Sequence, residues 1–464
     1  MEFSSIAFIF AFLPLTMLVY FCTPKKRRNL VLFIANLVFY AWAEPLFVFL
    51  LLAAAVVDYG AGLLLERYRP VRWKRRSVLW AVVALHLLAL LAFKYQVLLP
   101  WTDPNAALLT DVLVPLGISI YLFQGLSYVI DLYLQKIKVQ KNFIDFGVYL
   151  AFFPTMICGP ILRYSDLRIE LGNREETLNK ATTGYSLFIK GLSKKMLLAD
   201  SLLNIWYSIQ ELEHSQMSVL TAWLGIAAFA LAIYFYFGGY SDMARGIAKI
   251  LGFDIPANFN YPYVSRNINE FSRRWNISLI NWFKAYVFTP LAPNSSAPLI
   301  TVLKLLLTWT LVGAWYGNGV GFALWGLYLG VFILAERLFL VDLLNKIPVV
   351  LQRIYTLAVI LLGWVLFEMD TLPQALSYYG SLFSGPFIDK NSVALYYLGH
   401  YWLLLVLAIF CATNVWHNFT LKLEQQRPVL VRWGRIVSET ALTVICVVYA
   451  IGGQPNALDF FVRF

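Results

Sequence analysis

The chain has 464 residues, of which 60% are hydrophobic and 14% charged, with a net charge of +11. A soluble domain of ordinary composition has about a quarter of its residues charged, so water is excluded as the main solvent of this chain. Backbone groups that cross hydrocarbon must be hydrogen-bonded within the protein, and the apolar runs are long and lack the alternation typical of a β-barrel. The sequence therefore predicts an all-α, polytopic membrane protein, with one domain over residues 1–464.

The apolar segments predict about eleven membrane-associated helices. Those near 29–43 and 145–160 are too short to cross a bilayer alone, so we expect tilted, paired or re-entrant segments among them. The first segment has no small-residue cleavage site and should stay as a membrane helix. The segments lie near residues 5–22, 29–43, 46–66, 77–93, 109–133, 145–160, 185–205, 218–238, 298–315, 319–342, 350–367, 394–413 and 433–451.

The cations predict how the first helices are oriented. Lys and Arg cluster in residues 25–28, 67–76 and 136–141, and these clusters alternate with cation-poor turns around Glu44 and Asp103. Since cytoplasmic loops carry the excess of cations, we expect these three loops inside the cell and the N-terminus outside. The charges lie beside membrane segments, so anionic lipids are the expected partner and a nucleic acid is not.

Between residues 238 and 296 the pattern changes, because polar and charged residues become frequent and alternate with aromatic ones. We expect this segment to be embedded in the bundle as short broken helices; the alternative is an amphipathic hairpin lying on the headgroups. At membrane depth ionisable groups need partners, so Arg273 or Arg274 should pair with a carboxylate such as Asp242 or Glu270.

Residues 240–283, YSDMARGIAKILGFDIPANFNYPYVSRNINEFSRRWNISLINWF, resemble the signature of the membrane-bound O-acyltransferase superfamily. The branch is that of bacterial alginate O-acetyltransferase and of the D-alanyl transfer protein of teichoic acid synthesis. Three further motifs stand in the family's order: FFPTMICGPILRY at 152–164, AWYGNGVGFALWGLYLG at 314–330 and GWVLFEMDTLPQAL at 363–376. The resemblance covers nearly the whole chain.

The resemblance implies a ring of helices around a central tunnel in a bacterial cytoplasmic membrane. An acyl donor, either acyl-coenzyme A or an acyl-carrier thioester, would enter from the cytoplasm, and no cofactor would stay bound. The acyl group would pass outward to modify an exported cell-envelope polymer, with an extracytoplasmic acyl-transfer protein or a carrier protein as partner. The substrate-binding residues that it implies are Tyr240, Ser241, Asp242, Asn258, Asn260, Arg273, Arg274, Trp275, Trp315 and Arg163.

Both histidines of the family pattern are replaced in this chain. The family's Trp-His-Gly motif reads Trp-Tyr-Gly with Tyr316 at its centre, and Asn276 follows the Arg-Arg-Trp triplet where relatives have the second histidine. Ala285 stands where relatives commonly carry an aspartate, and Glu368 where they commonly carry an arginine. The chain's own histidines lie outside the family motifs and are expected to be packing or interfacial residues: His86, His214, His400 and His417.

Tyr316 and Asn276 remain the candidate catalytic residues. Loss of a general base costs about 10²–10⁴-fold in rate, and an unperturbed tyrosine, with a pKa of about 10, is protonated at neutral pH. A nearby cation such as Lys284, Arg273 or Arg274 could lower that pKa, or the two side chains could donate hydrogen bonds to the acyl carbonyl.

The other sequence features offer weaker chemistry. Cys158 has no neighbouring base or cation along the chain to make it a thiolate, and the four cysteines are expected to be buried small residues. No metal-ligand cluster or Gly-rich phosphate loop is present in the sequence.

Three functions stay open. The chain is an O-acyltransferase with a rebuilt catalytic pair, a catalytically silent relative that serves a partner as scaffold or acyl conduit, or a transporter, for which we find no pseudo-symmetric halves. The flanking motifs are intact, so Tyr316 and Asn276 should point toward a common internal cavity.

Overall fold

A computed structural model describes residues 2–95, 114–212, 217–291, 297–388 and 393–452. All regular elements in these ranges are helices. The chain divides into two compact units: residues 1–188 with 240–256, and residues 189–239 with 257–464. Helices α9 (Leu178–Ser193) and α11 (Val219–Ile250) run from one unit into the other. The prediction of a single domain stays a prediction.

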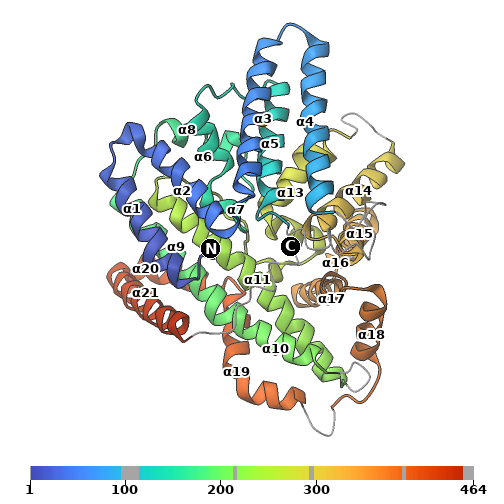
Figure 1. The fold of residues 1–464 in the computed structure, drawn as a ribbon. Coiled ribbons are helices and arrows are strands. Elements are labelled where there is room, and N and C mark those ends of the chain that lie inside the picture. The colour runs from blue at the N-terminus through green and yellow to red at the C-terminus, as the bar shows by residue number, and fades with distance from the viewer. Residues whose placement is uncertain (1, 96–113, 213–216, 292–296, 389–392, 453–464) are drawn as a thin grey trace. The chain divides into compact units, whose positions relative to one another are not determined.

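The first unit contains the N-terminal helices and the last turns of α11, with the residues that follow them up to 256. Its α3, α4 and α5 run beside one another, as Figure 1 shows for the blue and cyan helices. Besides the two shared helices, its elements are η1 (Phe8–Phe12), α1 (Leu13–Cys22), η2 (Lys25–Arg27), α2 (Arg28–Ala43), α3 (Val48–Arg67), α4 (Arg72–Phe93), α5 (Ile118–Tyr133), α6 (Phe143–Leu150), α7 (Phe153–Met156) and α8 (Tyr164–Gly172).

A buried carboxylate–imidazole pair joins α3 to α4. An oxygen of Asp58 on α3 lies 3.2 Å from Nε2 of His86 on α4, and both side chains are almost completely buried. Helix α5 approaches this pair through Gly125, where a Cβ atom would lie 1.9 Å from an oxygen of Asp58. Only a glycine fits at this point, so the three helices pack closely around a polar group that would be costly if it were unpaired.

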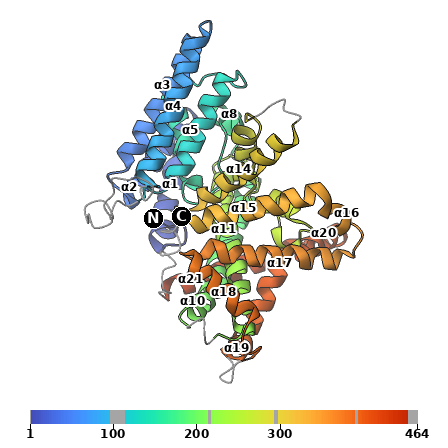
Figure 2. The ribbon, with the colours of Figure 1, turned by 90° about the vertical axis from the view of Figure 1, so that its right-hand side faces the viewer.

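The second unit contains the positions at which this chain departs from the family pattern: 276, 285, 316 and 368. Figure 2 shows α14, α15 and α17 in yellow and orange, and α15 contacts both of the others. Its further elements are η4 (Lys194–Ala199), α10 (Asp200–Gln210), η6 (Pro262–Val264), α12 (Ile268–Arg274), α13 (Ile277–Phe283), η7 (Lys284–Phe288), α14 (Pro298–Tyr316), α15 (Val320–Ala335), η8 (Glu336–Leu340), α16 (Val341–Leu344), α17 (Val349–Glu368), α18 (Leu372–Phe383), α19 (Val393–Cys411), α20 (Val415–Gln426) and α21 (Pro428–Ile451).

Helices α14 and α15 are held together at backbone distance by two glycines. A Cβ on Gly313 would lie 2.2 Å from the carbonyl oxygen of Phe322, and a Cβ on Gly326 would lie 2.2 Å from that of Trp309. Small residues that let backbones approach are typical of helix contacts in membranes. The close contact fixes the end of α14, where Tyr316 lies, against the start of α15.

Seven helices within the described ranges are long and apolar enough to cross a membrane: α3, α4, α11, α14, α17, α19 and α21. The larger number expected from hydropathy includes shorter elements such as α2 and α5, which have 16 residues each. The prediction of an all-α, polytopic membrane protein is confirmed. The predicted turn around Asp103 and part of the 109–133 segment lie outside the described residues.

Two segments differ in detail from the sequence-based expectation. Segment 145–160 is broken into α6 and α7, as its short length suggested. The prediction of short broken helices after residue 238 is wrong up to residue 250, because these residues continue α11, which is 32 residues long. Helix α11 is continuous because residues 219–250 contain no proline and keep enough apolar residues to bury one face. Short helices begin only at Pro262.

Candidate functional site

A buried glutamate anchors the short helix α12. Glu336, the first residue of η8, accepts hydrogen bonds from the backbone N–H groups of Ile268 (2.7 Å) and Asn269 (2.8 Å) and from the Tyr355 hydroxyl (3.3 Å). Anions are favoured at a helix N-terminus, where N–H groups lack partners within the helix. Sequence reasoning missed this residue, although an ionisable group within the apolar 319–342 segment was the signal that could have revealed it.

The predicted arginine–carboxylate pair is confirmed for Arg274, which lies 2.8 Å from Glu270. Arg274 also donates to the carbonyl oxygen of Asn260, and the N–H of Asn260 donates to the carbonyl of Arg274. Arg273 is exposed, and Asp242 pairs with Arg245 at 3.1 Å. The pairing therefore ties the loop before α12 to the end of that helix.

Asn276 connects α12 to α13 in a left-handed backbone conformation, with φ of 42°. Asparagine, aspartate and histidine are the non-glycine residues most often found there. Asn258 donates from Nδ2 to the Asn276 side-chain oxygen at 3.1 Å, and its own side-chain oxygen accepts from the N–H of Ser278 at 2.9 Å. Asn258 thus holds both the side chain of Asn276 and the start of the next helix.

Tyr316 meets Asn276 directly. The Tyr316 hydroxyl oxygen accepts from Asn276 Nδ2 at 2.9 Å and from Trp275 Nε1 at 3.1 Å. The exposed fractions are only 8% for Asn276 and 2% for Tyr316. The structure therefore brings the two candidate catalytic residues together in one buried hydrogen-bonded chain, from Asn258 through Asn276 to Tyr316.

Aromatic rings enclose this chain. The Tyr316 ring makes edge contacts at 5.2 to 5.4 Å with Trp315, Trp325 and Phe367, and Trp364 lies between Trp275 and Trp325. Such rings exclude water and fix the rotamers of the polar groups among them. Tyr316 and Asn276, at the positions where the family resemblance implies histidines, are therefore packed and hydrogen-bonded.

Lys284 and Arg273 are exposed, and Arg274 is paired with Glu270. The hydrogen bonds described for the Tyr316 oxygen come from an indole and an amide, which are both neutral. Activation of the phenol by one of these three cations stays a prediction.

The remaining predicted site residues belong to the first unit. Tyr240 and Ser241 are buried in the last turns of α11, and Asp242 pairs with Arg245, which also donates to the carbonyl of Ile255. Arg163 precedes α8 and binds Asp166, three residues on. These contacts are structural within that unit, and a role in substrate binding stays a prediction.

The loop after α11 is held by charges. Asp254 lies 2.8 Å from Lys180 and 2.7 Å from Lys249. The hydrogen bonds from these two ammonium groups hold the pKa of the Asp254 carboxyl below its usual range. Nearby, burial opposes the ionisation of Glu176, but hydrogen bonds from Tyr20 and Arg28 outweigh it and lower the pKa of that carboxyl.

The chain's histidines and cysteines lie in different environments. His86 is buried and paired with Asp58, which confirms it as a packing residue. His400 and His417 are exposed, and His214 lies outside the described residues. Cys446 is buried and Cys158 is half-buried, whereas Cys22 and Cys411 are exposed, so the expectation of four buried cysteines is wrong for the last two. Cys22 lies at the end of α1 and Cys411 at the end of α19, both apolar helices.

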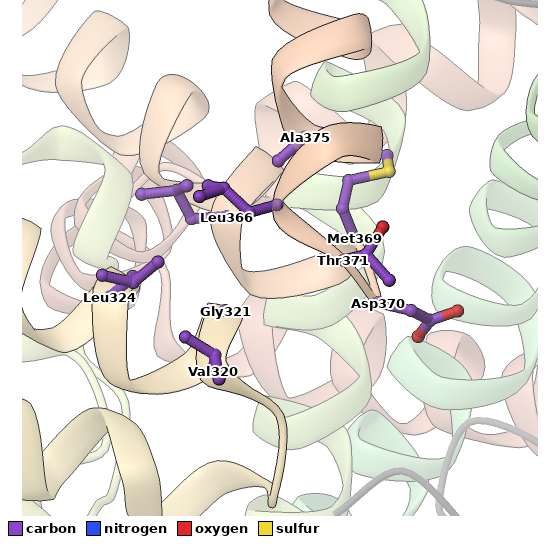
Figure 3. Close-up of a pocket in the computed structure, with 9 residues that line it drawn as sticks. Val320, Gly321, Leu324, Leu366, Met369, Asp370, Thr371 and Ala375 are labelled. Carbon is purple, nitrogen blue, oxygen red and sulfur yellow. The ribbon is translucent and has the colours of Figure 1, made fainter.

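Two adjoining cavities lie in the second unit where α17 ends. One, of about 310 Å³, is lined by aliphatic side chains that include Val320, Leu324 and Leu366 (Figure 3). The other, of about 220 Å³, is lined by Trp206, Gln210, Glu368 and neighbours. Met369 and Asp370 line both. Neither of these two cavities is lined by Tyr316 or Asn276, so a shared cavity for that pair stays a prediction.

Glu368, the residue found where relatives commonly carry arginine, accepts a hydrogen bond from Trp206 Nε1 at 3.1 Å. Within the ranges that the structure describes, no three His, Cys, Asp or Glu side chains are grouped so that they could hold a metal ion.

Comparison with known proteins identifies the family. The model of the membrane-bound O-acyltransferase family matches residues 79–356. The chain is 36% identical, over 392 residues, to a "Probable alginate O-acetylase" of Azotobacter vinelandii, covering 83% of this chain and 78% of that protein. It is 30% identical over 417 residues to a peptidoglycan O-acetyltransferase of Helicobacter pylori, covering 81% and 78%, and 27% identical over 234 residues to a teichoic acid D-alanyltransferase of Bacillus subtilis, covering 48% and 59%. The chain therefore belongs to the membrane-bound O-acyltransferase family.

Proposed function

We propose that this chain is the membrane component of an acyl-transfer system that modifies an exported cell-envelope polymer. The similarity to proteins named for alginate, peptidoglycan and teichoic acid supports this function class. The intact signature between residues 240 and 283, with its short helices packed beside α14, supports the same role.

The finer assignments are part of the same proposal. The donor is acyl-coenzyme A or an acyl-carrier thioester, and the partner is an extracytoplasmic acyl-transfer protein or a carrier protein. The chain lies in a bacterial cytoplasmic membrane with its N-terminus outside, as the cations at 25–28 and 67–76 suggest. A tunnel through the helices carries the acyl group.

The observation that bears most on the mechanism is the closed chain from Asn258 through Asn276 to Tyr316. Transfer breaks the carbonyl–sulfur bond of the thioester and forms a carbonyl–oxygen bond, and the proton of the acceptor hydroxyl ends on the departing thiolate. A general base normally carries that proton. An amide does not titrate, and both lone pairs of the Tyr316 oxygen already accept hydrogen bonds.

This observation favours a second candidate function, in which the chain is catalytically silent and acts as scaffold or acyl conduit for an active partner. In that case Asn276 and Tyr316 keep the shape of the transfer site without moving a proton. The first candidate requires instead that Tyr316 loses its proton or donates its hydroxyl hydrogen to the acyl carbonyl.

The experiment compares acyl transfer by cells or vesicles that contain the native chain, the Tyr316→Phe variant and the double variant with histidine at 276 and 316. The assay follows radiolabelled acetyl groups from the thioester into the exported polymer. If the native chain is inactive and the double variant gains transfer, the silent role is supported. If the native chain is active and Tyr316→Phe removes about 10²-fold or more of that activity, the phenol takes part in the chemistry.

A matched control separates chemistry from packing. Tyr328 on α15 is half-buried and donates one hydrogen bond to the carbonyl of Val359. Tyr328→Phe should therefore leave transfer unchanged. Failure of every variant and of the native chain to support acyl incorporation, with the partner proteins present, would contradict the acyl-transfer proposal.

A further inference from the structure

The two adjoining cavities of the second unit lie where several helices end. Helix α10 ends at Gln210, α17 ends at Glu368, and α15 begins at Val320. Helix α17 is long and apolar enough to cross a membrane. A helix that crosses a membrane ends near the lipid headgroups, so we expect both cavities at the boundary between hydrocarbon and headgroups.

The two cavities differ in chemistry. The larger is lined by Val320, Leu324 and Leu366, and it has the apolar surface that an acyl chain prefers. In Figure 3 the carboxylate of Asp370 points away from these aliphatic side chains. Asp370 lines both cavities, so it lies where the apolar part of an amphipathic ligand would meet its polar part.

The smaller cavity has acceptors and a buried donor that lacks a described partner. Its carboxylates are those of Glu368, which is buried, and Asp370, which is exposed. Gln210 also lines it, and the Nε2 atom of Gln210 is buried with no hydrogen-bond partner among the described residues. A buried donor without a partner is costly, so a ligand that brings an acceptor would be favoured.

We propose that the two cavities together bind a phospholipid whose headgroup carries an amine. Its ammonium group lies at the carboxylates of Asp370 and Glu368, a phosphate oxygen accepts from Gln210, and one acyl chain lies along Val320, Leu324 and Leu366. The site is distinct from the cationic loops at 25–28 and 67–76, which suit anionic lipids. Two carboxylates repel a headgroup whose net charge is negative.

The test uses the purified full-length chain in a nonionic detergent, with lipids of identical acyl chains. Native mass spectrometry counts bound lipid, and intrinsic tryptophan fluorescence follows thermal unfolding. Phosphatidylethanolamine should bind the native chain more tightly than phosphatidylglycerol does, and it should raise the melting temperature more. Soluble phosphoethanolamine, which lacks acyl chains, should do neither at the same concentration.

Asp370→Asn is the main variant, because this exposed side chain can change without disturbing the interior. It should weaken phosphatidylethanolamine binding about fivefold, as expected for one charge at a membrane surface, and strengthen phosphatidylglycerol binding, because one repelling carboxylate is gone. Asp342→Asn is the matched control, since Asp342 is an exposed carboxylate on α16 that lines neither cavity. Leu324→Trp, which fills the apolar cavity, should weaken binding of phosphatidylethanolamine without changing its headgroup preference.

Three results would overturn the proposal. Equal binding of the two phospholipids by the native chain would mean that the carboxylates do not select the headgroup. An unchanged affinity of Asp370→Asn would mean that the lipid binds elsewhere. If a glycosyl diacylglycerol with the same acyl chains binds as tightly as phosphatidylethanolamine, the polar cavity binds sugar hydroxyls and does not select an amine.

Discussion

Two buried polar pairs, one in each unit, differ in what they can do with a proton. In the first unit Asp58 and His86 lie 3.2 Å apart on neighbouring membrane helices, with exposed side-chain fractions of 0% and 2%. In the second unit Asn276 and Tyr316 lie 2.9 Å apart and are similarly buried. The first pair joins a carboxylate to an imidazole, whereas the second joins an amide to a phenol hydroxyl.

The comparison shows where this chain keeps histidine. At Asp58 the imidazole is required, because a buried carboxylate without a partner is costly. At position 316 the phenol occupies the place of the family's histidine and its two hydrogen-bond donors are neutral. The chain therefore retains a buried histidine for structure and replaces the two that the family pattern assigns to chemistry.

The largest effect is expected from His86→Leu. It removes the partner of a fully buried carboxylate, and breaking such a pair costs about 3–5 kcal/mol of unfolding free energy. Unfolding in mixed micelles, titrated with sodium dodecyl sulfate and followed by circular dichroism, measures the loss.

Two further variants make that result specific. Replacing both Asp58 and His86 by leucine should restore most of the stability, because no buried charge is left unpaired. His400→Leu should change stability by less than about 0.5 kcal/mol, because His400 is exposed on α19. If the single and double variants at the pair are equally unstable, the ion pair is not the cause.

A smaller loss is expected from Tyr316→Phe. This change leaves the buried N–H groups of Trp275 and Asn276 without their acceptor, which costs about 2 kcal/mol of unfolding free energy. Tyr328→Phe, which removes one hydrogen bond to a backbone carbonyl, should cost about 1 kcal/mol. Equal stability of Tyr316→Phe and the native chain in the same titration would contradict the closed network.

The smallest effect on stability is expected from Asp254, an exposed carboxylate whose contribution depends on pH, in contrast to the two buried pairs. Asp254 is 46% exposed and is held by Lys180 and Lys249, which lower the pKa of its carboxyl from the ordinary value of 3.8. Because the folded-state pKa is the lower one, the stabilisation is complete above about pH 4 and disappears as the pH falls through the folded-state value.

Asp254→Asn should therefore be slightly less stable than the native chain at neutral pH, by less than about 1 kcal/mol, as is usual for a surface ion pair. The difference should vanish in acid, below the lowered pKa. Thermal unfolding of both proteins between pH 2.5 and 7 measures it, and a constant difference over that range would contradict the assignment.

Several sequence-based predictions rested on local properties and succeeded for that reason. Hydropathy is carried by each segment, so the membrane helices could be predicted with their approximate bounds. The Arg274–Glu270 pair spans four residues of one helix, a spacing that places side chains together wherever the helix lies. Helix α11 was underestimated, because polar residues within 240–250 suggested a break that the packing of its apolar face does not require.

By itself the sequence determined the solvent, the helical class, the family and the two positions where the family's histidines are missing, because composition and contiguous motifs need no contacts to be recognised. Only the tertiary structure decided that the Tyr316 oxygen accepts from Trp275 and Asn276, that Glu336 anchors α12, and that His86 lies against Asp58. These partners are 28 to 68 residues apart in sequence. Their contact depends on how the helices pack, which spacing along the chain does not encode.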